Sequence, residues 1–160
     1  MAIGEASSST LALLRRGVLG LGALALIATG LELAMEQHWK QPSQLIPWVS
    51  LALSAIAIVL LVPPAPTRMQ VRIAQVLAVL VILSAAFGVL QHAQANYESA
   101  PLDFRFSDTW DSMNEVLRLW IAATHQVGPS PTLAPLALAY ASVCVLLATL
   151  RHSALDERQQ

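Results

Sequence analysis

Four long apolar runs dominate the 160-residue sequence and limit what the chain can fold into. A helix needs about 20 apolar residues to cross a hydrocarbon core that is about 30 Å thick. Each run has about this length and ends near polar residues or prolines. The expected membrane-spanning helices cover residues 17–35, 45–62, 71–91 and 132–150. The sequence therefore predicts an all-α fold, a bundle of four transmembrane helices that forms a single membrane domain over residues 1–160.

Composition excludes several other classes of protein. Hydrophobic residues make up 56% of the chain and charged residues only 12%, whereas about a quarter of the residues in a soluble domain are charged. The formal net charge is −1 and no run of Lys or Arg occurs, which argues against a nucleic-acid partner because phosphate binding needs clustered positive charge. The single cysteine, Cys144, excludes an internal disulfide and any metal site built from several cysteines.

The basic residues predict the orientation of the bundle, because Lys and Arg near helix ends are retained on the cytoplasmic side of a membrane. One side carries six of them: Arg15, Arg16, Arg68, Arg72, Arg151 and Arg158. The opposite side carries three: Lys40, Arg105 and Arg118. Both termini are therefore expected in the cytoplasm.

The long outer loop between the third and fourth predicted spans contains a helical pattern of its own. Ser107 or Asp108 can cap a helix, and apolar residues then recur at spacings of three and four. An amphipathic helix over residues 108–124 is therefore expected on the outer face. It is either a lid that packs on the bundle or a surface for a partner or lipid. The surface residues would be Trp110, Met113, Leu117 and Trp120.

Ionisable residues gather near the predicted outer ends of the first and third spans. A charge inside a membrane is unfavourable, so the presence of each of these residues requires an explanation. Two hypotheses remain open. In the first, an outward-facing polar pocket binds a cation or a small ligand, or passes protons. Its candidate residues are Glu32, Glu36, His92, Asn96 and Glu98. In the second, Glu32 is a structural group that accepts hydrogen bonds from a neighbouring helix.

No cofactor is predicted, although histidines leave two alternatives. Carboxylates and imidazoles together suit a divalent metal, and the candidate ligands are His38, His92 and His125. Haem would need two histidines that face each other across the bundle, and no CxxCH attachment motif is present. No spacing matches a known metal motif. The serines and Cys144 have no nearby base, so the sequence does not indicate an enzyme.

Several short segments together resemble a group of small, uncharacterised four-helix bacterial membrane proteins. The segments are Leu31-Glu32-Leu33, His38-Trp39, Ile46-Pro47, His92 with Asn96 and Glu98, Leu133-Ala134-Pro135 and Arg151-His152. The resemblance covers most of the chain. It implies the four-helix topology and a bacterial cytoplasmic (inner) membrane, but it names no substrate.

Two functions follow from these observations. The first is a non-enzymatic accessory or structural subunit of a larger membrane assembly, whose partners are the lipid bilayer and other membrane subunits or further copies of the chain. Long apolar surfaces and the lack of a catalytic set favour it. The alternative is a small membrane protein that handles an ion, metal or ligand through the outward-facing Glu/His cluster. The two differ in whether Glu32 faces the bundle interior or a partner helix.

Overall fold

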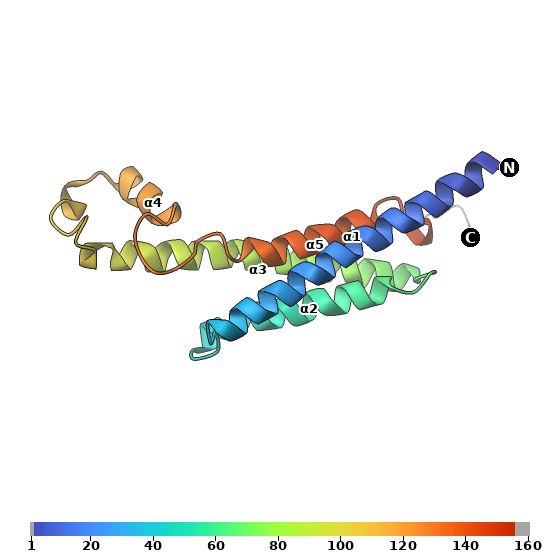
Figure 1. Ribbon diagram of the computed structural model, residues 1–160, viewed down its shortest axis with the longest axis horizontal. Helices are drawn as coiled ribbons and strands as arrows, with labels where there is room; N and C mark the ends of the chain where they lie inside the picture. Colours follow the sequence, from blue (N-terminus) through green and yellow to red (C-terminus); the bar gives the residue numbers. More distant parts are fainter. Residues whose placement is uncertain (1, 156–160) are drawn as a thin grey trace. The chain divides into compact units, whose positions relative to one another are not determined.

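The computed structural model describes residues 2–155, which form helices and turns without any β-strand. The predicted all-α fold is therefore confirmed. The longer helices are α1 (Ala2–Met35), α2 (Ile46–Leu61), α3 (Arg68–Ser99), α4 (Glu115–Ala123) and α5 (Leu136–Thr149) (Figure 1). Short 3₁₀ helices lie between or after them: η1 (Pro42–Leu45), η2 (Ala100–Leu102), η3 (Trp110–Ser112) and η4 (Ser153–Leu155).

The chain divides into two compact units. The first unit comprises Met1–Ser84 and Ala137–Gln160, and the second unit is Ala85–Leu136. The 32 residues of α3 extend over about 48 Å at 1.5 Å per residue, which is longer than a hydrocarbon core of about 30 Å. No proline interrupts the sequence of α3, so the helix continues from one unit into the other.

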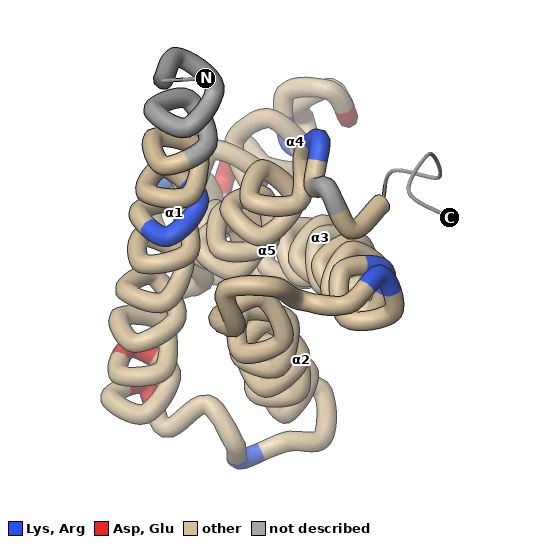
Figure 2. Tube along the Cα trace, turned by 90° about the vertical axis from the view of Figure 1, so that its right-hand side faces the viewer, with Lys and Arg blue, Asp and Glu red and all other residues tan. Residues whose placement is uncertain are grey.

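The first unit is a group of helices that lie side by side: α1, α2, α5 and the first part of α3 (Figure 2). Its core is made of aliphatic and small side chains from all four. Small residues let the helices approach closely. A Cβ added at Gly22 of α1 would lie 3.2 Å from the Cβ of Cys144 and 3.4 Å from the carbonyl oxygen of Ala141, both in α5. Buried polar groups in this core pair with each other, as in the hydrogen bond from Gln75 Nε2 to Thr149 Oγ1 (3.1 Å).

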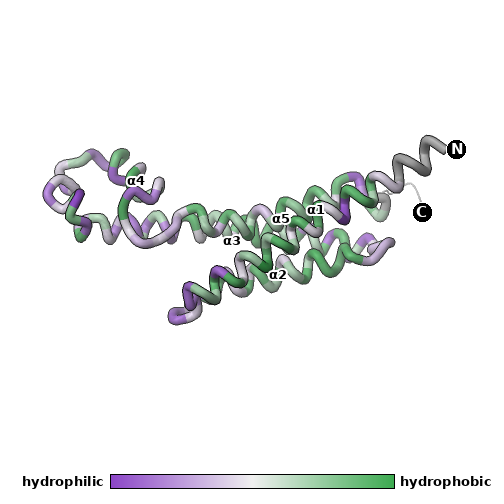
Figure 3. The backbone as a smooth tube through the Cα atoms, viewed as in Figure 1, coloured by the Kyte–Doolittle hydropathy of each residue, from purple (hydrophilic) through white to green (hydrophobic). Residues whose placement is uncertain are grey.

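Three described helical segments are long and apolar enough to cross a membrane: Ser9–Met35, Pro42–Leu61 and Arg68–Leu102. Figure 3 shows hydrophobic residues along the middle of α1 and α2. The fourth predicted span, residues 132–150, is only partly helical, because residues 132–135 form turns and α5 begins after Pro135. With 14 residues, α5 is shorter than the other three segments. These helices have the length and composition of an integral membrane protein.

A guanidinium group links the first and last long helices. Arg15 Nη2 of α1 donates hydrogen bonds to the carbonyl oxygens of Leu150 (3.1 Å) and Arg151 (3.0 Å), which follow the end of α5. The last carbonyl groups of a helix have no partner within the helix and carry partial negative charge, so a cation there stabilises the helix. Burial, and next the positive charge of Arg15, lower the pKa of His152.

We expect Arg15→Ala to destabilise the first unit by about 1 kcal/mol, because these charged hydrogen bonds to α5 are lost. The pKa of His152 should rise toward its ordinary value and stay below it, since burial, the larger cause, remains. Thermal unfolding in detergent and an NMR titration of His152 measure the two effects. Arg16→Ala is the matched control, because Arg16 is exposed. Equal effects of the two substitutions would contradict a specific role of Arg15.

The second unit has a small aromatic core of its own. Trp110 is only 2% exposed and clusters with Ala100, Ile121 and Val127. The rings of Tyr97 and Phe106 meet Trp110 edge-on, with centroids 5.3 Å and 6.3 Å away. This core holds the segments after α3 together.

The predicted outer helix is shorter than expected. It begins at Glu115 instead of near residue 108, because Asn114, and neither Ser107 nor Asp108, caps it. The Asn114 side chain accepts a hydrogen bond from the backbone N–H of Leu117 (2.9 Å).

Candidate functional site

Glu32 and Glu36 lie near the end of α1 in the first unit, and both are exposed. Their side chains therefore face away from the other helices of that unit. Among the residues that the structure describes, no hydrogen bond or ion pair reaches the carboxylate of Glu32. Within its own unit, Glu32 is not the interhelical hydrogen-bond acceptor that the second sequence hypothesis describes.

His38 follows a tight helix end. Gln37 adopts a left-handed conformation (φ 51°), and the N–H of His38 donates to the carbonyl of Leu33 (2.9 Å), an arrangement that terminates α1. The carbonyl oxygen of His38 accepts a hydrogen bond from the indole N–H of Trp48 in α2 (2.8 Å). The backbone of His38 thus fastens the α1–α2 connection, and its half-buried side chain remains a candidate ligand.

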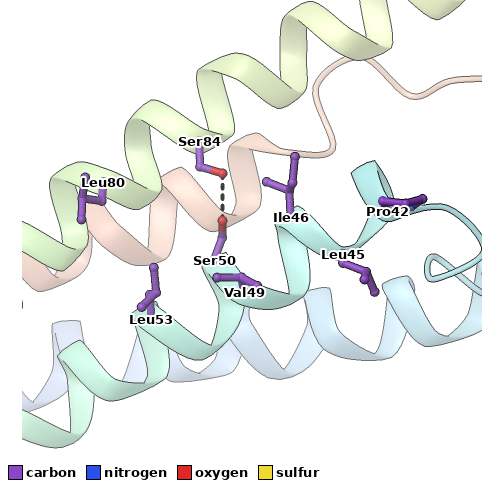
Figure 4. A pocket seen from close by; sticks show the side chains of 8 residues that line it. All are labelled: Pro42, Leu45, Ile46, Val49, Ser50, Leu53, Leu80 and Ser84. Atoms are coloured by element: carbon purple, nitrogen blue, oxygen red, sulfur yellow. Dashed lines mark hydrogen bonds between the residues drawn. The ribbon is translucent and has the colours of Figure 1, made fainter.

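An open apolar groove of about 360 Å³ lies in the same unit between α2 and α3 (Figure 4). Its polar groups are the hydroxyls of Ser50 and Ser84, which hydrogen-bond to each other over 2.8 Å. The remaining lining is apolar: Pro42, Leu45, Ile46, Val49, Leu53 and Leu80. No charged side chain lines this groove, so it does not form the predicted polar pocket.

The other four sequence candidates belong to the second unit. His92 is half-buried, whereas Glu98 and His125 are exposed. Glu98 accepts a hydrogen bond from Gln94 Nε2 (2.8 Å), one turn earlier in α3. Because Glu32, Glu36 and His38 lie in the first unit, neither unit alone contains the whole predicted cluster. Among the side chains that the structure describes, no three of His, Cys, Asp or Glu lie close enough together to hold a metal ion.

Asn96 has a structural environment. It is completely buried, and its Nδ2 donates to the carbonyl of Ser130 (2.8 Å), to Thr132 Oγ1 (3.1 Å) and to the carbonyl of Ala122 (3.3 Å). Its Oδ1 accepts the backbone N–H of Ser130 (2.9 Å). These contacts use the hydrogen-bonding groups of the amide to fix the segment after α4 against α3. The geometry therefore favours a positioning role for Asn96 over ligand binding.

The four predicted surface residues of the outer helix divide into two kinds. Trp110 is in the core of the second unit and Met113 packs against it, so neither presents a free surface. The prediction is wrong for Trp110, because it lies in the short 3₁₀ helix η3 and not in α4, and its ring packs against Tyr97. Leu117 and Trp120 are exposed, as a surface role requires.

The charged residues of α4, Glu115 and Arg118, contact Tyr97 of the same unit. The hydroxyl of Tyr97 in α3 donates to both carboxylate oxygens of Glu115 (3.1 and 3.2 Å), and Arg118 Nη2 lies 2.7 Å from Glu115 Oε2. The Arg118 guanidinium also lies over the ring of Tyr97, 5.8 Å from its centroid. Sequence analysis did not connect Tyr97 with Glu115 and Arg118, although the spacing of Glu115 and Arg118 by three residues was a usable signal.

A second ion pair of this unit lies in the loop between α3 and α4. Arg105 Nη2 lies 2.6 Å from Asp103 Oδ2 and donates to the carbonyl of Gln126 (2.8 Å), beyond α4. Hydrogen bonds from the side chain and then the backbone of Arg105 lower the pKa of Asp103 to about 2. From the sequence, Arg105 served only to predict the orientation of the bundle in the membrane.

Because the folded-state pKa of Asp103 is below its ordinary 3.8, ionised Asp103 stabilises the second unit above about pH 4. This contribution should be lost as the pH falls through about 2. We expect Asp103→Asn to loosen the contact with Gln126 at neutral pH, seen as faster hydrogen exchange in residues 100–130. Asp108→Asn is the control, because Asp108 is an exposed acid in the same loop. A titration of the Asp103 carboxyl near 4 would contradict the proposed pairing.

Comparisons with protein-family models, curated proteins and solved structures find no match to the chain.

Proposed function

We propose that this chain is a non-enzymatic accessory or structural subunit of a larger membrane assembly. In this proposal it crosses a bacterial cytoplasmic membrane four times, has both termini in the cytoplasm and places the second unit on the outer side. One observation carries the functional proposal, namely the apolar character of the outward face of α4.

This outward face consists of Val116, Leu119, Trp120 and Ala123, which recur at spacings of three and four. Val116 is 77% exposed and Trp120 is 62% exposed. The opposite face is held by Ile121 and Ala122, which are buried. A helix that meets water on its outward side carries polar residues there, whereas a helix that docks on another surface carries apolar ones. An exposed Trp in such a stripe is typical of an interaction site.

The charge of the second unit favours a protein over a lipid surface as the occupant. Residues 85–136 contain five acidic and two basic residues, a formal charge of −3. Membrane surfaces that carry a net charge are negative, so this unit gains no electrostatic attraction to them. The five acidic residues are Glu98, Asp103, Asp108, Asp111 and Glu115.

The ligand-handling alternative receives less support. One of its candidates, Asn96, already uses its amide group in hydrogen bonds to Ser130 and Thr132. No observation on the described residues favours it over the subunit function.

Purification of the tagged full chain from native membranes in mild detergent tests the proposal. A stoichiometric protein partner should appear by mass spectrometry, and Trp120→Ala should lower its recovery by about tenfold, the loss of a typical buried aromatic anchor. Leu133→Ala is the matched control, because Leu133 is an exposed apolar residue of the same unit outside α4. Recovery of the wild-type chain alone and monodisperse would contradict the subunit function.

A further inference from the structure

One side of α1 packs against the other helices of the first unit, and the opposite side is exposed. Leu19, Leu26 and Thr29 are buried on the side toward the other helices of the first unit. Figure 2 shows α1 at the edge of that group, with no other helix of the first unit on its far side. The far side carries exposed apolar residues at spacings of three and four: Leu24, Ile27, Leu31 and Met35. We call these four residues together with Glu32 the outer face of α1.

Glu32 is the unusual member of this face. It is exposed and lies at the edge of this face, three residues before Met35, the last residue of α1. A carboxylate that faces lipid is unfavourable unless a charge or hydrogen-bond donor compensates it. Glu36 is on the same side, one turn further along. Within the described part of the chain, no basic side chain reaches Glu32.

We infer that the outer face of α1 binds a transmembrane helix of the partner, and that this helix carries a Lys or Arg opposite Glu32. The inference rests on the proposed function as a subunit. Charge complementarity names the partner's chemistry, because a basic group would neutralise Glu32 and, near the membrane edge, also attract Glu36. The apolar residues of the face would supply the packing contacts.

The α1 helix of a second copy does not fit this face. Two copies inserted with the same orientation would bring Glu32 against Glu32, and like charges repel. The basic residues of α1 are Arg15 and Arg16, and the latter lies about 24 Å along the helix from Glu32 at 1.5 Å per residue. Figure 2 shows basic and acidic positions at separate places along α1. A copy of α1 therefore cannot supply the missing positive charge at the right depth.

Lipid alone fits poorly as well. Acyl chains offer no hydrogen-bond donor, and the short Glu side chain cannot extend to the headgroups as Lys and Arg do. The same side of α1 also has room for a close neighbour, because a Cβ added at Gly17 or Gly20 meets nothing within 4 Å. Small residues of this kind let a second helix backbone approach closely.

Photocrosslinking in native membranes tests the inference directly. A photoreactive residue at Leu24 or Leu31 should crosslink to the partner recovered with the full chain. The same residue at Val59 is the control, because Val59 is an exposed apolar position of α2.

Glu32→Gln should reduce partner recovery by about tenfold. Glu32→Lys should reduce it further, and a Lys or Arg to Glu change in the partner should then restore it. Glu32 is exposed, so unchanged helix content in Glu32→Gln separates binding from folding.

Each of the other possible outcomes contradicts the inference. If the partner is recovered but crosslinks from Val59 only, or Glu32→Gln leaves its recovery unchanged, the inference is overturned and the subunit function stands. Crosslinks from Leu24 and Leu31 to a second copy, or to lipid alone, also overturn the inference. If no partner is recovered at all, both the inference and the proposed function fail.

Discussion

Gly128→Ala is expected to destabilise the second unit by about 3 kcal/mol or more. Gly128 has φ = 83°, a conformation that residues with a side chain rarely adopt. Its added Cβ would lie 2.6 Å from the Cα of Asn96 and 2.7 Å from Ser99 Oγ. The backbone of α3 cannot move away without breaking the hydrogen bonds of Asn96 to Ser130.

Hydrogen exchange of the full chain in detergent measures this effect. In Gly128→Ala, amides of residues 85–136 should exchange much faster than in the wild type. Gly20→Ala is the control, because Gly20 lies within α1 and its added Cβ meets nothing within 4 Å. That substitution should be neutral or slightly stabilising, since alanine favours helix. Unchanged exchange in Gly128→Ala would show that the turn does not depend on a residue without a side chain.

Trp110→Ala is expected to destabilise the second unit by about 3–5 kcal/mol, as for other buried Trp residues. The indole is nearly inaccessible and fills the space between Tyr97, Phe106 and Ile121. Its removal would abolish the edge-on contacts of Tyr97 and Phe106 and leave a cavity beside these rings.

Near-UV circular dichroism and thermal unfolding test this expectation. Trp120→Ala is the matched control, because Trp120 is largely exposed on α4. The two substitutions should separate the two roles, with Trp110→Ala lowering stability and Trp120→Ala lowering partner recovery. A stability loss for Trp120→Ala as large as that for Trp110→Ala would contradict the assignment of Trp120 to the surface.

Sequence periodicity predicted the apolar helices well, because membrane crossing requires length and apolar composition that can be read directly. The span expected at 45–62 is found as α2 (Ile46–Leu61). Polar residues after position 90 suggested that the helix ends at 91, whereas α3 continues to Ser99 because those residues are compatible with a helix in water.

The second unit was less predictable because its structure depends on contacts between distant residues. Trp110 and Trp120 look equivalent in a helical pattern, but a turn before Asn114 directs Trp110 into a core with Tyr97. Asn96 looked like a polar candidate at a membrane edge. Its role depends on Ser130 and Thr132, more than thirty residues later, which no local pattern reveals. The kinds of residue in the candidate site could therefore be predicted from the sequence, but their arrangement in space could not.

The contact between Arg15 and the end of α5 has a consequence for biosynthesis. Its hydrogen bonds join residues that are 135 and 136 positions apart, so they can form only after α5 has been synthesised. Until then, the Arg15 guanidinium lacks these two acceptors. A chain truncated before Leu150 never gains them, and its α1 lacks this link to the end of α5.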